Sequence, residues 1–173
     1  MNIALDLEIE DKRWQQVLPD IENAAQRVQK AVFEYLSQNE DLPFLTADKP
    51  VSVNLCLSDD AHVRQLNRDF RQMDKPTNVL SFANIDFDSF EGTADLFGEI
   101  ALGDIIIAYE TMQKEADEMQ ISLYDHFCHL FTHGLLHLSG YDHIEAEDAA
   151  YMENLEKNIL QTLGIANPYA DEE

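Results

Sequence analysis

The chain has 173 residues, of which 45% are hydrophobic, and this length and composition suit one globular domain with a core of its own. No apolar run approaches the roughly 20 residues needed to cross a bilayer, and the opening MNIALDLEIEDKRW lacks the basic-then-apolar pattern of a signal peptide, so we expect a cytoplasmic protein without a membrane span. The formal net charge of −23 argues against nonspecific binding of nucleic acid.

The first fifty-eight residues are predicted to supply two strands and a helix. Residues 3–9 (IALDLEI) are typical of an edge strand, and residues 20–37 place apolar side chains at helical spacing. In VSVNLCLS, residues 51–58, Val and Leu alternate with polar residues and Cys56, which indicates a strand with one buried face. Cys56 and Cys128 are far apart in a chain without a signal peptide, so we expect both to be reduced.

The next predicted helix, at about residues 61–71, carries two stripes at helical spacing. One is apolar, and the other consists of Arg64, Arg68 and Arg71. Together with Lys75 they make a locally positive segment in a very acidic chain. Charge alone favours a solvated helix face for this segment.

The second half of the chain mixes strands with longer helices. NVLSF is predicted to form a strand, the Asp-, Gly- and Ser-rich residues 83–97 a loop, and GEIALGDIIIA a buried strand. Helical periodicity follows over three segments, at about 109–118, 121–138 and 145–163, with Gly140 and Gly164 as stops for the last two.

The acidic C-terminal region is most simply solvated. The stretch AEDAAYMENLEKN is expected to form a solvated helix, and the acidic tail from about residue 168, ending in ADEE, a frayed end. Strands and helices mix without a strict βαβ repeat. We therefore expect an α+β fold, with a small mixed sheet of about four strands packed with helices in a single domain over residues 1–173.

Histidines are concentrated near the end of the helix at 121–138. His133 and His137 are one helical turn apart and project from the same face. Gly140 lets the chain reverse, so that His143 can return to the same point. Three imidazoles with an open fourth position are typical of a catalytic zinc site. The alternative to a metal site is that three core or surface histidines come together by chance. The third histidine and the glycine at the reversal argue against this alternative.

The same spacing occurs in the zinc-protease signature H-E-x-x-H-x-x-G-x-x-H, but Gly134 replaces the glutamate that moves protons there. His126 and His129 lie one or two turns earlier, where they can either support the site or be satisfied locally. Asp142 can orient an imidazole, stabilise the turn or act as a base, and we favour orientation or turn structure over catalysis.

The block HGLLHLSGYDH closely resembles the H-G-x-L-H-L-x-G-Y-D-H signature of the YbeY family, bacterial endoribonucleases of ribosomal RNA maturation. LNRDFRQMDKPTNVLSF is similar to a second motif of that family, and LFGEIALGDIIIA to its strand segment with LGDI. The resemblance runs from about Val51 to the C-terminal helix. The first fifty residues match only in general pattern.

The resemblance implies a zincin-like metal-binding helix within an α+β domain. The family's ligands match His133, His137 and His143, which would bind one Zn²⁺ ion. The family's arginine, thought to contact RNA phosphate, matches Arg71. Asn78 stands where many members have aspartate, so no carboxylate role is expected at this position.

The activity implied is that of a single-strand-directed, zinc-dependent endoribonuclease in maturation and quality control of ribosomal RNA. Lys75, Arg68 and Arg64 are then candidates for steering the RNA backbone. The implied partners are ribosomal RNA and the small ribosomal subunit with its proteins. A ribosome-bound substrate would also reconcile RNA cleavage with the charge of −23.

Two other functions fit the same histidines. A metal-dependent hydrolase of peptides or esters is one, although Gly134 argues against a protease. A non-catalytic ribosome-assembly factor with a structural metal is the other, although three ligands rather than four argue against a closed structural site. Three imidazoles also suit nickel, copper or iron.

Overall fold

A four-stranded mixed sheet organises the computed structural model, which describes residues 3–46, 49–84 and 99–169. The strand order is β1-β2-β4-β3; the first three strands run parallel, and β3 is antiparallel to β4. This confirms the predicted α+β fold with about four strands, and it places residues 3–9 at an edge. The strands span Ile3–Ile9 (β1), Val51–Ser58 (β2), Val79–Ala83 (β3) and Ile100–Ala108 (β4).

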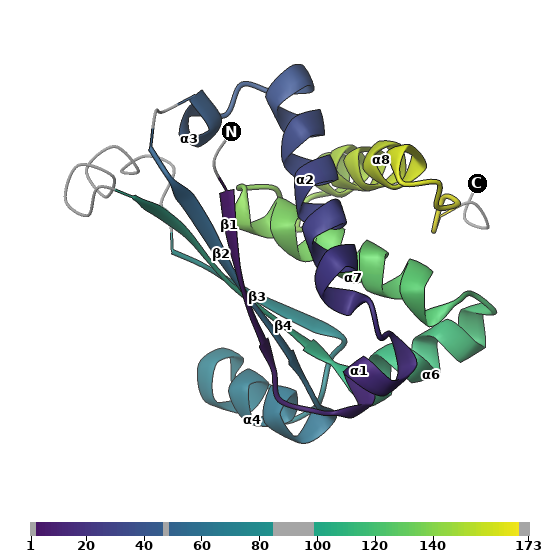
Figure 1. Cartoon of the computed structure of the whole chain (residues 1–173). Helices are drawn as coiled ribbons and strands as arrows, with labels where there is room; N and C mark the ends of the chain where they lie inside the picture. The colour runs from purple at the N-terminus through teal and green to yellow at the C-terminus, as the bar shows by residue number, and fades with distance from the viewer. Residues whose placement is uncertain (1–2, 47–48, 85–98, 170–173) are drawn as a thin grey trace.

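The helices cover the two faces of this sheet unequally. The longer ones are α2 (Ile21–Asn39), α4 (Asp60–Arg71), α6 (Tyr109–Met119), α7 (Leu123–Leu138) and α8 (Ala146–Thr162). Figure 1 shows α2, α7 and α8 on one side of the sheet and α4 on the other. The short helices α1 (Arg13–Val17) and α3 (Pro43–Thr46) lie where no element was predicted. Within the described ranges, no helix is long and apolar enough to cross a bilayer.

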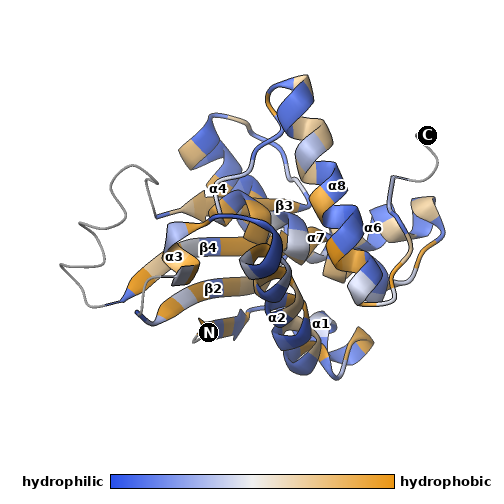
Figure 2. Ribbon diagram, turned by 90° about the horizontal axis from the view of Figure 1, so that it is seen from above, coloured by the Kyte–Doolittle hydropathy of each residue, from blue (hydrophilic) through white to orange (hydrophobic). Residues whose placement is uncertain are grey.

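Strand residues alternate between the main core and the opposite face of the sheet. Figure 2 shows apolar residues concentrated on β2 and β4. Four alternating residues of β2 are at most 3% exposed, which confirms the predicted strand with one buried face. They are Val51, Val53, Leu55 and Leu57. Under α4, a smaller apolar cluster forms on the other face from Val63, Leu80, Ile106 and Ala108.

Glycine ends α7 and α8 as predicted. Gly140 has a φ of +104°. The N–H of Gly140 donates to His137 O (3.1 Å), and the N–H of Tyr141 donates to Leu136 O (3.0 Å). This pair of bonds is the Schellman motif, which needs a residue with positive φ. Gly164 ends α8 with the same pattern of bonds. The turn after α7 is therefore set by local sequence.

α8 is not the solvated helix that its acidic sequence suggests. Its buried residues recur at helical spacing and pack into the core, while the other acidic side chains occupy the outer face. The expectation failed because it weighed charge and overlooked this stripe. The predicted loop at 83–97 lies almost wholly outside the described residues, and the ADEE tail lies wholly outside them. The buried positions of α8 are Met152, Leu155, Glu156, Ile159 and Leu160.

A bulge in β4 draws β3 and α7 close to it. The register between β2 and β4 shifts at Leu102, so that Val53 pairs with Gly103. Gly103 has a φ of +146°, and a Cβ added there would lie 2.2 Å from Phe82 O and 2.9 Å from Leu138 Cδ2. Only glycine allows this approach, which sets the end of the histidine-bearing helix against the edge of the sheet.

We expect Gly103→Ala to lower the free energy of unfolding by roughly 2–4 kcal/mol, because the methyl group meets a backbone oxygen at a strained φ. Gly164→Ala is the matched control: its φ is +77°, but nothing lies within 4 Å of an added Cβ. That change should cost only about 1 kcal/mol. Urea unfolding followed by circular dichroism measures both, and equal losses would contradict the tight approach at Gly103.

Candidate metal centre

Three imidazoles meet where α7 ends, as the sequence predicts. His133 and His137 project from the last turns of α7, and their Nε2 atoms lie 3.0 Å apart. The turn at Gly140 returns His143, whose ring centroid is 5.4 Å from that of His133 and 5.1 Å from that of His137. One ligand atom from each ring lies within 4.8 Å of the others. This separation suits nitrogen ligands around a single cation.

A buried carboxylate from α8 holds the first of these rings. Glu156 is 0% exposed, and its Oε1 accepts a hydrogen bond from His133 Nδ1. Its Oε2 contacts His129 Nε2 at 3.4 Å and accepts from Tyr169 Oη. Burial disfavours the charged form, yet the hydrogen bonds from His129 and His133 lower the pKa of Glu156 to about 2. An ionised acceptor at Nδ1 leaves the Nε2 lone pair of His133 free to face a metal.

The second imidazole is held in the neutral form that binds metal. Burial, together with the nearby rings of His133 and His143, lowers the pKa of His137 to about 4. Its ring also hydrogen-bonds the backbone of Tyr141. Three imidazoles with nitrogen atoms directed at one point make a donor set that fits a divalent cation such as Zn²⁺.

The histidines form one wall of a cleft of about 600 Å³, and Arg71 and Lys75 lie among the residues that line it. Arg71 ends α4, and its Nη2 donates to Ser81 O of the edge strand β3 at 2.9 Å. Among the residues that the structure describes, no carboxylate forms an ion pair with Arg71 or Lys75. Their positive charge is therefore available to a ligand in the cleft.

The other two arginines of the predicted stripe lie outside this cleft. Arg64 is tied to Asp74 through two bonds, Nε to Oδ1 at 2.8 Å and Nη2 to Oδ2 at 3.2 Å. Arg68 contacts Asp69 at 3.3 Å. All four side chains are about half exposed. The structure thus brings Arg71 and Lys75 to the histidines but leaves Arg64 and Arg68 on the outer surface of α4.

His126 belongs to a neighbouring network that positions the start of β3. Its Nε2 lies 2.9 Å from Glu115 Oε1, and Glu115 also accepts from Asn78 Nδ2 at 3.0 Å. The Asn78 Oδ1 accepts from the N–H of Val79 at 2.7 Å. The amide of Asn78 donates to Glu115, whereas an aspartate at this position would place a second carboxylate beside it. His126 is therefore tied to Glu115 through Nε2, while its buried Nδ1 has no hydrogen-bond partner among the described residues. His129 contacts the site through Glu156.

Gly134, which stands where the protease signature has glutamate, is tightly packed. Gly134 is buried where α7 crosses β4, and a Cβ added there would lie 3.0–3.2 Å from the side-chain carbons of Ile105. A glutamate at this position would require Ile105 to shift. Asp142 lines the cleft, and its Oδ1 accepts from the N–H of Ile144 at 3.3 Å, as expected of a turn aspartate.

Sequence reasoning missed Glu156 and Tyr169. A signal for Glu156 exists, because it is the one charged residue within the apolar stripe of α8. A charge at a core position is rarely buried without a partner. No comparable signal marks Tyr169, which reaches Glu156 and His129 from beyond the end of α8.

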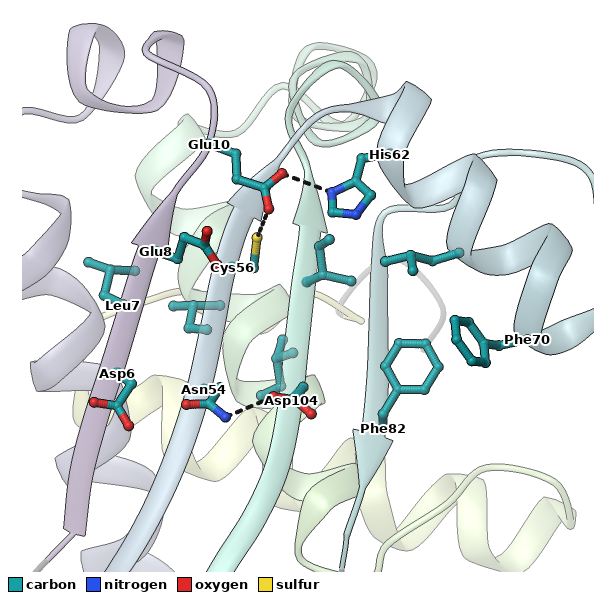
Figure 3. A pocket seen from close by; sticks show the side chains of 14 residues that line it. Asp6, Leu7, Glu8, Glu10, Asn54, Cys56, His62, Phe70, Phe82 and Asp104 are labelled. Atoms are coloured by element: carbon teal, nitrogen blue, oxygen red, sulfur yellow. Dashed lines mark hydrogen bonds and ion pairs between the residues drawn. The ribbon is translucent and has the colours of Figure 1, made fainter.

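A second group of candidate ligands lies on the opposite face of the sheet, where Glu8, Glu10 and Cys56 converge (Figure 3). Glu10 accepts from Cys56 Sγ at 3.1 Å, from Ser58 Oγ at 3.0 Å and from His62 Nδ1 at 2.9 Å. Burial and Glu10 raise the pKa of Cys56, so its thiol stays protonated. Cys56 and Cys128 are free, as predicted. Glu10 and the Cys56 thiol are thus already bonded to each other, unlike the three histidines, whose nitrogen atoms face one point.

The comparisons with known proteins agree with this geometry. A family model described as "Endoribonuclease YbeY" matches residues 8–164. The protein named Endoribonuclease YbeY from Sphingopyxis alaskensis is 49% identical over 156 residues, covering 90% of this chain and 93% of the relative. Its namesake from Sinorhizobium fredii is 40% identical over 171 residues, covering 98% and 94%. The solution structure of TM1509 from Thermotoga maritima matches with a TM-score of 0.55 at 23% identity, over 91% of this chain and 87% of that one, and shows likeness of fold alone.

We expect Glu156→Gln to weaken zinc binding roughly 10- to 100-fold, because the substitution keeps the shape but removes the charge that orients His133. Competition with a chromophoric chelator measures the affinity. Glu115→Gln is the control, since Glu115 also bonds a histidine of α7, His126, that is not a ligand. Zinc affinity unchanged in Glu156→Gln, or reduced equally in both variants, would contradict the role of Glu156.

Proposed function

Because the chain belongs to the YbeY family of endoribonucleases, we propose that it is a metal-dependent endoribonuclease that cuts single-stranded ribosomal RNA during maturation and quality control. We treat residues 1–173 as one such domain, acting in the cytoplasm. The observation that carries the proposal is the cleft, where three imidazoles face Arg71 and Lys75. With a divalent cation on the imidazoles, positive charge would lie on both sides of the cleft, which suits a phosphodiester with anionic oxygens.

The donor set supports one Zn²⁺ ion held by His133, His137 and His143. When bound, such an ion supplies Lewis-acid chemistry that stabilises negative charge on phosphate oxygens and lowers the pKa of water. The chain's own contribution is orientation: Glu156 fixes the tautomer of His133. The low pKa of His137 keeps that ring neutral.

Arg71 is placed to bind the scissile phosphate. Its bond to Ser81 O holds the planar guanidinium at the edge of β3, and the remaining N–H groups are free to donate to two phosphate oxygens. Lys75 adds positive charge in the same cleft. We assign Arg64 and Arg68 a weaker role in steering the RNA backbone from the surface of α4, where salt screens their charge.

The cleft favours a phosphate over an amide substrate. Among the described residues that line it, Asp142 is the one carboxylate, and it bonds the backbone of Ile144. A zinc peptidase relies on a carboxylate to carry a proton to a poor leaving amine. Gly134 supplies no such carboxylate, and a side chain there would meet Ile105 at 3.0–3.2 Å from its Cβ.

The net charge of −23 shapes the choice of substrate. Outside the cleft the acidic surface repels RNA, so cleavage of free RNA should be weak and should depend steeply on salt. We therefore propose that the substrate is ribosomal RNA presented on the small ribosomal subunit, with basic ribosomal proteins as partners. Their charge would offset the repulsion.

Arg71→Ala should lower RNA cleavage by at least roughly 100-fold, because it removes the side chain that donates to the phosphate. Arg27→Ala, on α2, removes the same charge outside the cleft and should change the rate little. Gel assays of zinc-loaded protein on a structured RNA with single-stranded loops measure both, and thermal melts show whether each variant folds. Wild-type activity in folded Arg71→Ala would refute its assigned role.

Removal of the metal should abolish cleavage and leave the fold, because the buried core does not depend on the histidines. Chelation followed by dialysis provides the metal-free protein. Circular dichroism should be unchanged, and one equivalent of Zn²⁺ should restore activity. Unfolding on chelation would instead favour a structural metal in a non-catalytic assembly factor.

A further inference from the structure

An exposed aromatic ring stands beside the proposed phosphate-binding arginine. Phe70 lies in the last turn of α4, next to Arg71, and is 68% exposed. Its ring is nevertheless held by a neighbour. It meets Phe82 of β3 edge to face, with ring centroids 5.8 Å apart and an interplanar angle of 67° (Figure 3). The pair therefore offers a supported aromatic surface to solvent.

This aromatic pair is continuous with the cleft. The guanidinium carbon of Arg71 lies 5.6 Å from the centroid of the Phe82 ring, within cation–π range. The same guanidinium donates to Ser81 O, and Arg71 lines the cleft that holds the histidines. Arg71 thus lies at the edge of β3, between the metal ligands on one side of the sheet and the two phenylalanines on the other.

Beyond the pair, a groove of about 630 Å³ runs over the open face of the sheet. Its apolar end holds Phe70 and Phe82. Asp104 comes next on the neighbouring strand, because it pairs with Phe82 in the register of β3 with β4. Figure 3 shows the far end lined by acidic side chains from β1 and from the chain just after it, namely Asp6, Glu8 and Glu10.

We propose that Phe70, supported by Phe82, stacks against one base of the single-stranded RNA whose adjacent phosphate Arg71 binds; this inference rests on the proposed function. A nucleotide carries an anion and a flat π-face close together, and Arg71 with Phe70 presents the matching pair. The acidic side chains further along the groove repel the next phosphate. The groove therefore accepts one base and turns the backbone away.

Stacking predicts a specific pattern of activities. Zinc-loaded Phe70→Ala and Phe70→Leu should lose roughly 5- to 100-fold in kcat/KM on single-stranded RNA, chiefly through KM, because stacking of a base on an aromatic ring is lost. Phe70→Tyr and Phe70→Trp should stay within a few-fold of the wild type. Leu is the matched control, since it keeps an apolar side chain but has no ring.

A substrate that lacks one base separates stacking from a structural effect. RNA with an abasic nucleotide beside the cleaved bond, on the 5′ or the 3′ side, should be a poorer substrate for the wild type in one of the two positions. On that substrate, Phe70→Ala should not lower kcat/KM any further. The proposal would be overturned if Phe70→Ala lowered kcat/KM on both abasic substrates as much as on intact RNA. A Phe70→Leu variant as active as the wild type would also overturn it.

Binding gives a readout that does not require cleavage. Trp14, the chain's single tryptophan, is 0% exposed, so Phe70→Trp adds an exposed fluorophore to a constant background. A short phosphorothioate RNA should quench this added fluorescence. It should not quench that of Met119→Trp, placed at the exposed end of α6 away from the cleft.

The two proposals can fail separately. Quenching of Phe70→Trp without any RNA cleavage by the wild type would refute the proposed function and support the stacking surface. Cleavage by the wild type without quenching would refute the stacking surface and leave the proposed function standing. If a protein partner rather than RNA covers Phe70, its replacement by Ala will leave cleavage of free RNA unchanged, which also overturns the inference.

Discussion

The buried carboxylate of Glu156 links the folding of this protein to the geometry of its candidate site. An ionised group at 0% exposure would cost several kcal/mol without partners, and here His129, His133 and Tyr169 supply them. α8 can therefore pack against α7 with its charge compensated only when these side chains are in place. The bond that stabilises the carboxylate also fixes the tautomer of His133, a proposed metal ligand. One interaction thus serves both stability and the donor set.

The edge strand β3 is the second element on which the site depends, because two different faces of the sheet meet there. On one side the end of α7 brings the histidines, and the bulge at Gly103 lets strand and helix approach. On the other side α4 ends in Phe70 and Arg71, and Arg71 bonds back to β3. Positive charge collects at this edge, whereas the open face beyond it is acidic. An RNA strand that follows the favourable charge must therefore turn around β3.

Local rules predicted much of this arrangement, and tertiary contacts account for the rest. The alternation in β2 and the stop at Gly140 depend on neighbouring residues, so both could be read from the sequence, and with them the convergence of three imidazoles. Glu156 is different: its charge suggested solvent, and its burial follows from partners on another helix. The pairing of the arginines is likewise a tertiary property: Asp74 bonds Arg64, whereas Arg71 bonds the backbone of β3. The type of a charged residue does not show which partner it binds in the folded chain. These partners decide which charges are available to the cleft.

X-ray absorption at the zinc edge tests the central claim most directly, because the described part of the chain offers two groups of candidate ligands with different atoms. With one equivalent of Zn²⁺ bound, our account predicts a first shell of nitrogen and oxygen at about 2.0–2.1 Å, with the imidazole scattering of three histidines and no sulfur. The shell should lose one imidazole in His143→Ala. A sulfur scatterer at about 2.3 Å would place the metal with Cys56 on the opposite face of the sheet and would contradict the account.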